Sequence, residues 1–228
     1  MTQHWSLALR FSFRSSGLML AIISGALLFA RLLIALANME LAASTFSSFE
    51  VVVPLIAGLH AALLFAPDDE PALELLLAAP RPTAYLIYER LAILIGLQGG
   101  LALVLSLLTV VTVPGANLAD IVMRWLPASV CIVGLCMAAT LYSRRSNFGV
   151  LTAIALCVAM AFGKEVILPV FPQLWFMIFY LDPFTVTTGQ YFFNRLFLLT
   201  VGVAMVALVI YRMRDEEWLL GNQEVKNG

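Results

Sequence analysis

Apolar residues form six long runs along this chain of 228 residues, and charged residues, prolines or glycines separate the runs. Most runs are close to the roughly 20 residues that an α-helix needs to cross a bilayer, although the fifth is shorter. The predicted spans are Ser16–Ala37, Phe49–Ala66, Tyr85–Val111, Ile121–Tyr142, Phe148–Phe162 and Tyr191–Met213. The pattern therefore predicts an all-α integral membrane protein with six transmembrane helices in one domain, residues 1–228.

The composition supports this prediction. Hydrophobic residues make up 62% of the chain and charged residues 12%, whereas a typical soluble domain is about 45–50% apolar and about 25% charged. A soluble domain of this size still exposes about a quarter to a third of its unfolded surface, so it could not bury so many apolar residues. The net charge of −1 gives no field that would attract nucleic acid, and we expect no such partner.

The first apolar run permits two interpretations. Arg10 and Arg14 precede it and Ala35-Leu36-Ala37 resembles a cleavage site, which are features of a secretory signal peptide. However, the run from Gly17 to Ala37 is longer than the roughly 7–15 residues of a signal core. We favour a first span that is retained. Residues 1–15 carry a narrow polar stripe that includes both arginines, which predicts an amphipathic helix lying at the membrane surface.

Basic residues predict the orientation. With the N-terminus inside, nine of the thirteen basic residues lie on the inner side: Arg10, Arg14, Arg81, Arg90, Arg144, Arg145, Arg212, Arg214 and Lys226. Inner loops of membrane proteins carry such an excess. Both termini, including the tail at 214–228, are therefore predicted to be cytoplasmic.

Residues 67–83, between the second and third spans, predict a short cytoplasmic helix. The acidic residues at 68–70 and Pro71 suit a first helical turn, and Pro80 and Pro82 end the helix. A helix of about nine residues is not stable alone. Its apolar ridge consists of Leu73, Leu76 and Leu77. It packs either into a groove of a partner protein or against the membrane surface.

Residues 164–190, before the last span, are apolar but interrupted by Pro169, Pro172 and Pro183. An interrupted stretch of this kind is typical of a re-entrant or interfacial segment. We predict a pair of short re-entrant helices on the outer side, with Trp175 and Tyr180 at the interface.

This layout resembles the permease subunits of the ABC-2 type transporter family. Members have an amphipathic elbow helix, six spans, a coupling helix after the second span and a re-entrant segment before the sixth. The family's coupling motif corresponds here to Asp69-Glu70, Leu73–Leu76, Pro80 and Tyr85–Arg90. Asp182-Pro183-Phe184-Thr185 stands where members often carry Asn-Pro-Leu-Thr. The chain departs from the family in its acidic motif opening, in Arg90 for Lys and in Asp182 for Asn.

The resemblance implies a transport subunit of the cell (inner) membrane that is not an enzyme. Such a subunit pairs with a second permease copy or paralogue and docks separate ATP-binding-cassette ATPases. The expected coupling residues are Glu70, Leu73, Glu74, Leu76, Leu77, Pro80 and Arg81. The sequence contains no Gly-x-x-x-x-Gly-Lys-Ser/Thr phosphate loop, so we expect the partner to hydrolyse ATP and this chain to hold no cofactor.

Ionisable residues inside predicted spans are candidates for functional sites. Arg31 either extends to the outer interface or pairs with Glu50 at the top of the second span. His60 is either a hydrogen-bonded packing residue or a substrate or proton site. The expected determinants of the outer gate are Glu165, Asp182 and Pro183. The three cysteines lie in apolar runs, and we predict no metal site.

Other functions remain open at this level. A haem-exporter B-like subunit of cytochrome c maturation has a similar length and layout. A secondary carrier without an ATPase usually shows paired broken helices, and only one broken segment is seen here. An intramembrane enzyme would need a convergent catalytic pair, which the sequence does not suggest.

Overall fold

A computed structural model describes residues 17–37, 42–66, 83–181 and 186–213, and within these ranges every regular element is a helix. The elements are α2 (Gly17–Ala37), α3 (Ala42–Leu64), α5 (Thr83–Leu94), the π-helix η2 (Ile95–Gly99), α6 (Gly100–Thr112), α7 (Leu118–Ser143), α8 (Ser146–Val170), the 3-10 helix η3 (Pro172–Met177) and α9 (Thr188–Arg212). The all-α class predicted from the sequence is therefore confirmed.

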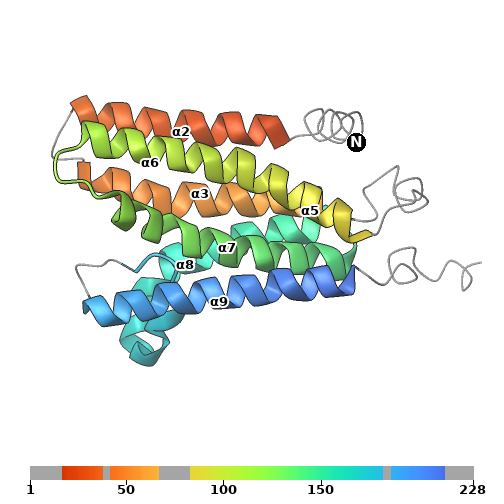
Figure 1. Ribbon diagram of the computed structural model, residues 1–228. Coiled ribbons are helices and arrows are strands. Elements are labelled where there is room, and N and C mark those ends of the chain that lie inside the picture. Colours follow the sequence, from red (N-terminus) through yellow and green to blue (C-terminus); the bar gives the residue numbers. More distant parts are fainter. Residues whose placement is uncertain (1–16, 38–41, 67–82, 182–185, 214–228) are drawn as a thin grey trace, which may run out of the picture.

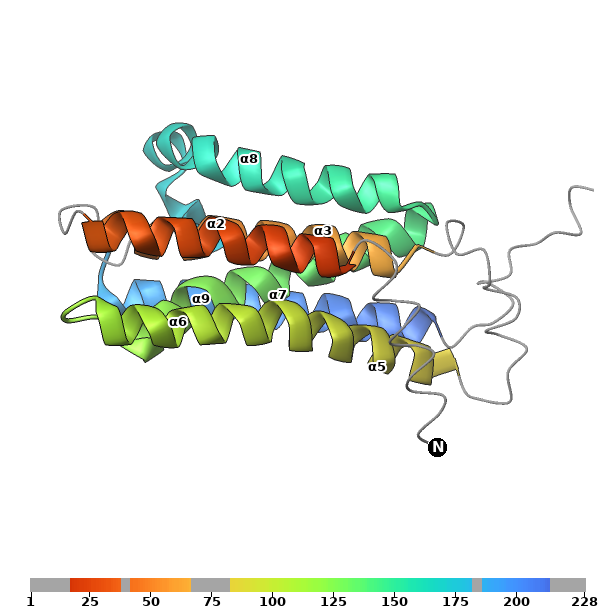
Figure 2. The ribbon, with the colours of Figure 1, turned by 90° about the horizontal axis from the view of Figure 1, so that it is seen from above.

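The helices form a bundle in which successive rods run in opposite directions (Figure 1). α5, η2 and α6 follow one another without a break and make one rod. α2, the α5–η2–α6 rod and α8 begin at one end of the bundle, where α3, α7 and α9 finish, and we name it the proximal end (Figure 1). We name the opposite end, where α2 and α6 finish and α9 begins, the distal end. Seen from above, α8 flanks the bundle on one side and the α5–η2–α6 rod flanks it on the other (Figure 2).

In the described part of the chain, three helices are long and apolar enough to cross a membrane: Ile87–Thr112, Leu118–Ser143 and Thr188–Arg212. Shorter apolar helices cover Ile22–Ile34, Phe49–Leu64 and Ser146–Ala159. Many large apolar side chains lie on the outside of the bundle, among them Met19, Leu151 and Val111, which is 83% exposed. These helices suggest a membrane protein, whereas the full set of six spans stays a prediction.

The fifth apolar helix ends later than predicted, and the pair of short re-entrant helices before α9 stays a prediction. The fifth apolar run was expected to end at Phe162, but α8 continues through Lys164 and Glu165 to Val170. Lys and Glu are both good helix formers, so their charges do not end the helix. Pro169 lies inside the helix, which ends at Val170, and the backbone of Phe171 has left the helical region with φ −129° and ψ 70°. η3 then forms a single separate short helix in this described stretch.

α7 is packed against α3, α8 and α9. Glycines allow the closest approach: a Cβ atom on Gly202 of α9 would lie 2.5 Å from the carbonyl oxygen of Val130 on α7. A Cβ on Gly134 would meet the backbone of α9 in the same way. Small residues let membrane helices pack backbone to backbone, so α7 and α9 form a closely fitted pair.

The connection between α7 and α8 is short. Only Arg144 and Arg145 separate the two helices, and Arg144 adopts a left-handed conformation with φ 63°. Its N–H donates to the carbonyl of Leu141, which satisfies a group at the end of α7.

Candidate functional site

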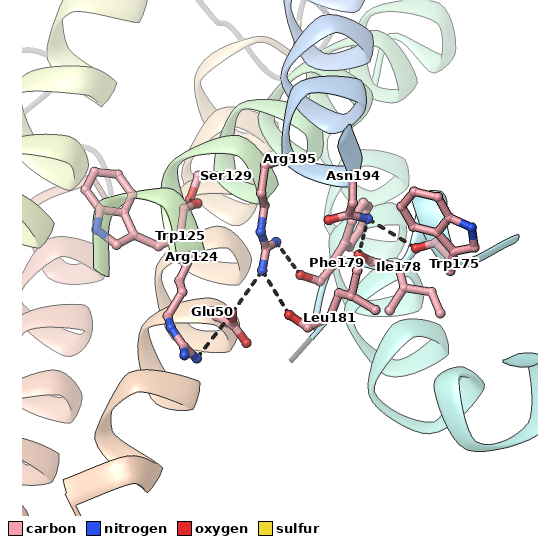
Figure 3. A network of polar contacts seen from close by, with 10 residues as sticks. All are labelled: Glu50, Arg124, Trp125, Ser129, Trp175, Ile178, Phe179, Leu181, Asn194 and Arg195. Atoms are coloured by element: carbon pink, nitrogen blue, oxygen red, sulfur yellow. Dashed lines mark hydrogen bonds and ion pairs between the residues drawn. The ribbon is translucent and has the colours of Figure 1, made fainter. Parts of the chain in front are cut away.

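Three charged side chains from different helices meet inside the bundle towards its distal end (Figure 3). Glu50 comes from α3, Arg124 from α7 and Arg195 from α9. Each lies about two helical turns, roughly 10 Å, from the distal end of its helix. Arg195 is 0% exposed and Glu50 is 4% exposed. Charges buried this deeply are costly unless they are paired and hydrogen-bonded, so the contacts of this cluster determine whether it is stable.

Arg195 contacts both the carboxylate of Glu50 and the chain before α9. Its Nη2 lies 2.9 Å from Oε1 of Glu50, and its Nη1 donates to the carbonyl of Phe179 at 2.7 Å. Its guanidinium also lies 4.7 Å from the centroid of the Tyr191 ring, within the range of a cation–π interaction. Nη1 of Arg124 lies 3.7 Å from the same Glu50 oxygen. One carboxylate oxygen therefore links α3 to two other helices.

Asn194, the neighbour of Arg195, binds main-chain carbonyls of the residues that precede α9. Its side-chain amide nitrogen lies 3.2 Å from the carbonyl of Trp175, and 2.9 Å from those of Phe176 and Ile178. The two amide hydrogens are shared among three acceptors. We name residues 171–181 the distal segment. Asn194 and Arg195 bind the distal segment through main-chain oxygens, so its position depends on these two side chains.

The polar groups of the cluster are not fully paired. Of the five buried side-chain polar atoms without a hydrogen-bond partner among the described residues, three belong here: the Tyr180 hydroxyl, Asn194 Oδ1 and Arg195 Nε. Tyr180 lies beside Cys157 of α8, and burial raises the pKa of its phenol, so the group stays neutral. Native proteins leave few such atoms unpaired. Their concentration here means that the hydrogen-bonding groups between the distal segment and the helices are not all satisfied.

A second polar contact lies nearer the proximal end. Nδ1 of His60 on α3 is 3.4 Å from Nε2 of Gln98, and both residues are buried. Nε2 of His60 has no partner among the described residues. Gln98 belongs to the π-helix η2, and short π-helical turns are frequent at functional sites. Arg90 of α5 also donates to the carbonyl of Leu64 near the end of α3. These two contacts join α3 to the rod that follows it.

The structure brings only some of the predicted site residues into view. The coupling residues Glu70, Leu73, Glu74, Leu76, Leu77, Pro80 and Arg81 lie outside the described residues, as do Asp182 and Pro183. So do the predicted elbow helix at 1–15 and the tail at 214–228. Arg31 lies in α2 and Glu165 in α8, but their side-chain surroundings are not described. The pairing of Arg31 with Glu50 stays a prediction.

Glu50 and His60 are the predicted residues whose contacts the structure defines. Sequence reasoning did not select Arg195, Asn194 or Gln98 as site residues. A signal was present for the first two, because adjacent Asn and Arg inside an otherwise apolar run are expensive to bury. Gln98 stood among glycines, and nothing in that pattern indicated a π-helix.

The described residues contain no group of three or more His, Cys, Asp or Glu side chains that could hold a metal ion. Cys131, Cys136 and Cys157 are free and buried among apolar neighbours. Comparison with family models, with curated proteins and with solved structures finds no match for this chain.

Proposed function

We propose that this chain is the transmembrane subunit of an ATP-driven exporter of the ABC-2 type, with six spans. The observation that carries the proposal is the position of residues 66 and 83. These residues flank the predicted coupling helix, and both lie at the proximal end of the bundle, where α2 begins and α9 finishes (Figure 1). An antiparallel bundle of this kind presents the connecting segment on the same side as both ends of the described chain.

Charged residues support a cytoplasmic proximal end. Arg144, Arg145 and Arg212 lie at this end, and Arg90 lies about two turns inside it. At the distal end, Asp120 is exposed in the first turn of α7. An excess of arginine and lysine on one side is typical of the cytoplasmic side. In this orientation the segment at 67–82 faces the cytoplasm, where a separate ATPase would reach it.

The contacts between α3 and α5 support a coupling role. Arg90 binds the carbonyl of Leu64 and Gln98 contacts His60, so the helices on both sides of residues 67–82 are joined to each other. A force applied to this segment would move α3 together with α5. The partner hydrolyses ATP, and this chain, with a second permease copy, forms the translocation path.

Co-purification with the ATPase tests the proposal. The unaltered chain, expressed with its native partners and extracted in a mild detergent, is expected to carry an ATPase chain with it. Replacing Leu73, Leu76 and Leu77 by Ala removes the apolar ridge and should abolish this association. The matched control replaces three exposed leucines of the bundle by Ala, at Leu103, Leu107 and Leu151, and should retain it.

Two outcomes would contradict the proposal. One is a native complex without any ATPase chain. The other is substrate transport into vesicles that lack ATP, which would indicate a secondary carrier. If the ATPase is present and only haem stimulates it, the chain belongs with the haem-exporter B-like subunits rather than with exporters of other substrates.

A further inference from the structure

We propose that Glu50 and Arg195 form a latch that holds the distal segment, residues 171–181, against the end of the bundle. Movement of α3 then releases this segment. The latch itself is argued from contacts in the described residues. Only its control by movement that begins at residues 67–82 rests on the proposed function.

The first argument is the division of contacts on one side chain. Nη1 of Arg195 holds the distal segment at the Phe179 carbonyl, while Nη2 holds α3 at Glu50 (Figure 3). The carbonyl of Leu181 lies 3.5 Å from the same Nη2. One guanidinium therefore connects the distal segment to α3, and a shift of Glu50 changes the position of the group that binds Phe179.

The second argument is electrostatic. The carboxylate of Glu50 lies between the guanidinium groups of Arg124 and Arg195. If α3 withdraws this carboxylate, the buried guanidinium of Arg195 loses the carboxylate oxygen that lies 2.9 Å from its Nη2. A buried guanidinium that loses its carboxylate is strongly disfavoured. Arg195 then turns towards water and leaves the Phe179 carbonyl without its donor.

The third argument is that the held position is only moderately stable. Asn194 Oδ1 and Arg195 Nε are buried without hydrogen-bond partners among the described residues. Unpaired buried groups oppose the state in which they occur. The distal segment contains no α-helix, since it consists of the 3-10 helix η3 and a turn at Phe179 and Tyr180.

The experiment measures access to the distal segment. Ile178 is 3% exposed, and its side chain takes no part in the polar contacts, since Asn194 binds its carbonyl. The Ile178→Cys variant is reconstituted in lipid vesicles, and the rate of labelling by a membrane-impermeant maleimide is measured. The chain without this substitution gives the background from Cys131, Cys136 and Cys157, which are buried.

Adding Glu50→Gln should raise the labelling rate about tenfold or more, because a charge-assisted contact is lost. Arg195→Lys keeps the charge but loses the fork that spans two partners, and should give a smaller rise. The matched control is Ser106→Ala, which removes the buried contact from Trp125 Nε1 to Ser106 Oγ at 3.2 Å and should leave the rate unchanged.

Size-exclusion elution shows whether each variant is folded. If Glu50→Gln does not fold, Arg195→Lys alone decides. If the folded variants are labelled at the same rate as the chain that carries Ile178→Cys alone, the latch is wrong.

A second measurement separates the latch from the proposed function. With the ATPase partner bound, ATP should raise the labelling of Ile178→Cys, and the Glu50→Gln variant should show a high rate that no longer depends on ATP. Glu50→Gln can raise the labelling rate while ATP leaves the rate of the chain with Ile178→Cys alone unchanged. The latch is then supported. In that case, control of the latch from residues 67–82 is wrong.

Discussion

Two of the buried polar contacts in this bundle, the distal cluster and the His60–Gln98 contact, differ in charge and in the number of partners. Towards the distal end, Glu50, Arg195 and Asn194 make ionic contacts and hydrogen bonds to several main-chain carbonyls. Nearer the proximal end, His60 and Gln98 share one contact of 3.4 Å between neutral groups. The first set determines where a segment without long helices lies. The second joins two helices that already pack through apolar side chains.

This difference shows which polar groups the fold depends on. A carboxylate and a guanidinium buried together become very costly if either is removed, because the survivor stays charged. A hydrogen bond between neutral side chains in a membrane protein contributes about 0.6 kcal/mol on average. We therefore expect the distal cluster to be far more sensitive to substitution than the His60–Gln98 contact.

The largest effect is expected for Arg195→Met, which removes the charge and retains most of the volume. Glu50 loses its closest partner and Phe179 loses its donor, so the free energy of unfolding should fall by about 3 kcal/mol. Unfolding in detergent, followed by tryptophan fluorescence, measures the change. The double variant Glu50→Gln with Arg195→Met should recover part of the loss. A single variant as stable as the unaltered chain would show that the distal cluster is dispensable.

Asn194→Leu should be next, with a loss of about 2 kcal/mol, because the carbonyls of Trp175, Phe176 and Ile178 lose their shared donor. Asn194→Asp is the sharper comparison. It keeps the shape but offers only acceptors when ionised, so it should destabilise the chain at least as much. A neutral Asn194→Asp variant in the same unfolding assay would contradict the role of the amide hydrogens.

The sequence does not predict most of this difference between the distal cluster and the His60–Gln98 contact. The helical class followed from the long hydrophobic runs, since each run is a local feature of the sequence. The pairing of Glu50 with Arg195 joins residues 145 positions apart, and no local pattern encodes it. The sequence could show that Arg31, Arg124 and Arg195 were costly in an apolar setting, but not which of them Glu50 would meet.

The sequence did not predict the π-helix or the end of α8, and the reasons differ. A π-helix of five residues changes the hydrogen-bond register without a distinctive composition, so Gln98 was not predicted to meet His60. The continuation of α8 past Lys164 was missed because charged residues were taken to end the apolar run. Charge limits where a helix can sit relative to lipid, but it does not by itself end a helix.

Gln98→Leu should have a small effect, about 0.6 kcal/mol, because it removes one neutral hydrogen bond and leaves the apolar packing of α3 in place. The double variant His60→Leu with Gln98→Leu should be close to neutral, since both partners are replaced by apolar groups. The same unfolding assay applies. A loss above about 2 kcal/mol would mean that this contact resembles the distal cluster after all.

The smallest effect is expected for Asp120→Asn. Asp120 is an acidic residue on the distal side, as Glu50 is, but it is exposed in the first turn of α7. Its favourable interaction with the helix dipole is worth about 0.3–1 kcal/mol and is screened by salt. The change in unfolding free energy should be within about 0.5 kcal/mol and should vanish in high salt. A larger loss would show that burial is not what separates Glu50 from Asp120.

The connection at Arg144 and Arg145 has a consequence for how the helices can move. With two residues between them, the proximal ends of α7 and α8 are tied together. If both helices span the membrane, as we propose, neither can shift far along the bilayer normal without the other. The two arginines would keep this shared end at the cytoplasmic surface.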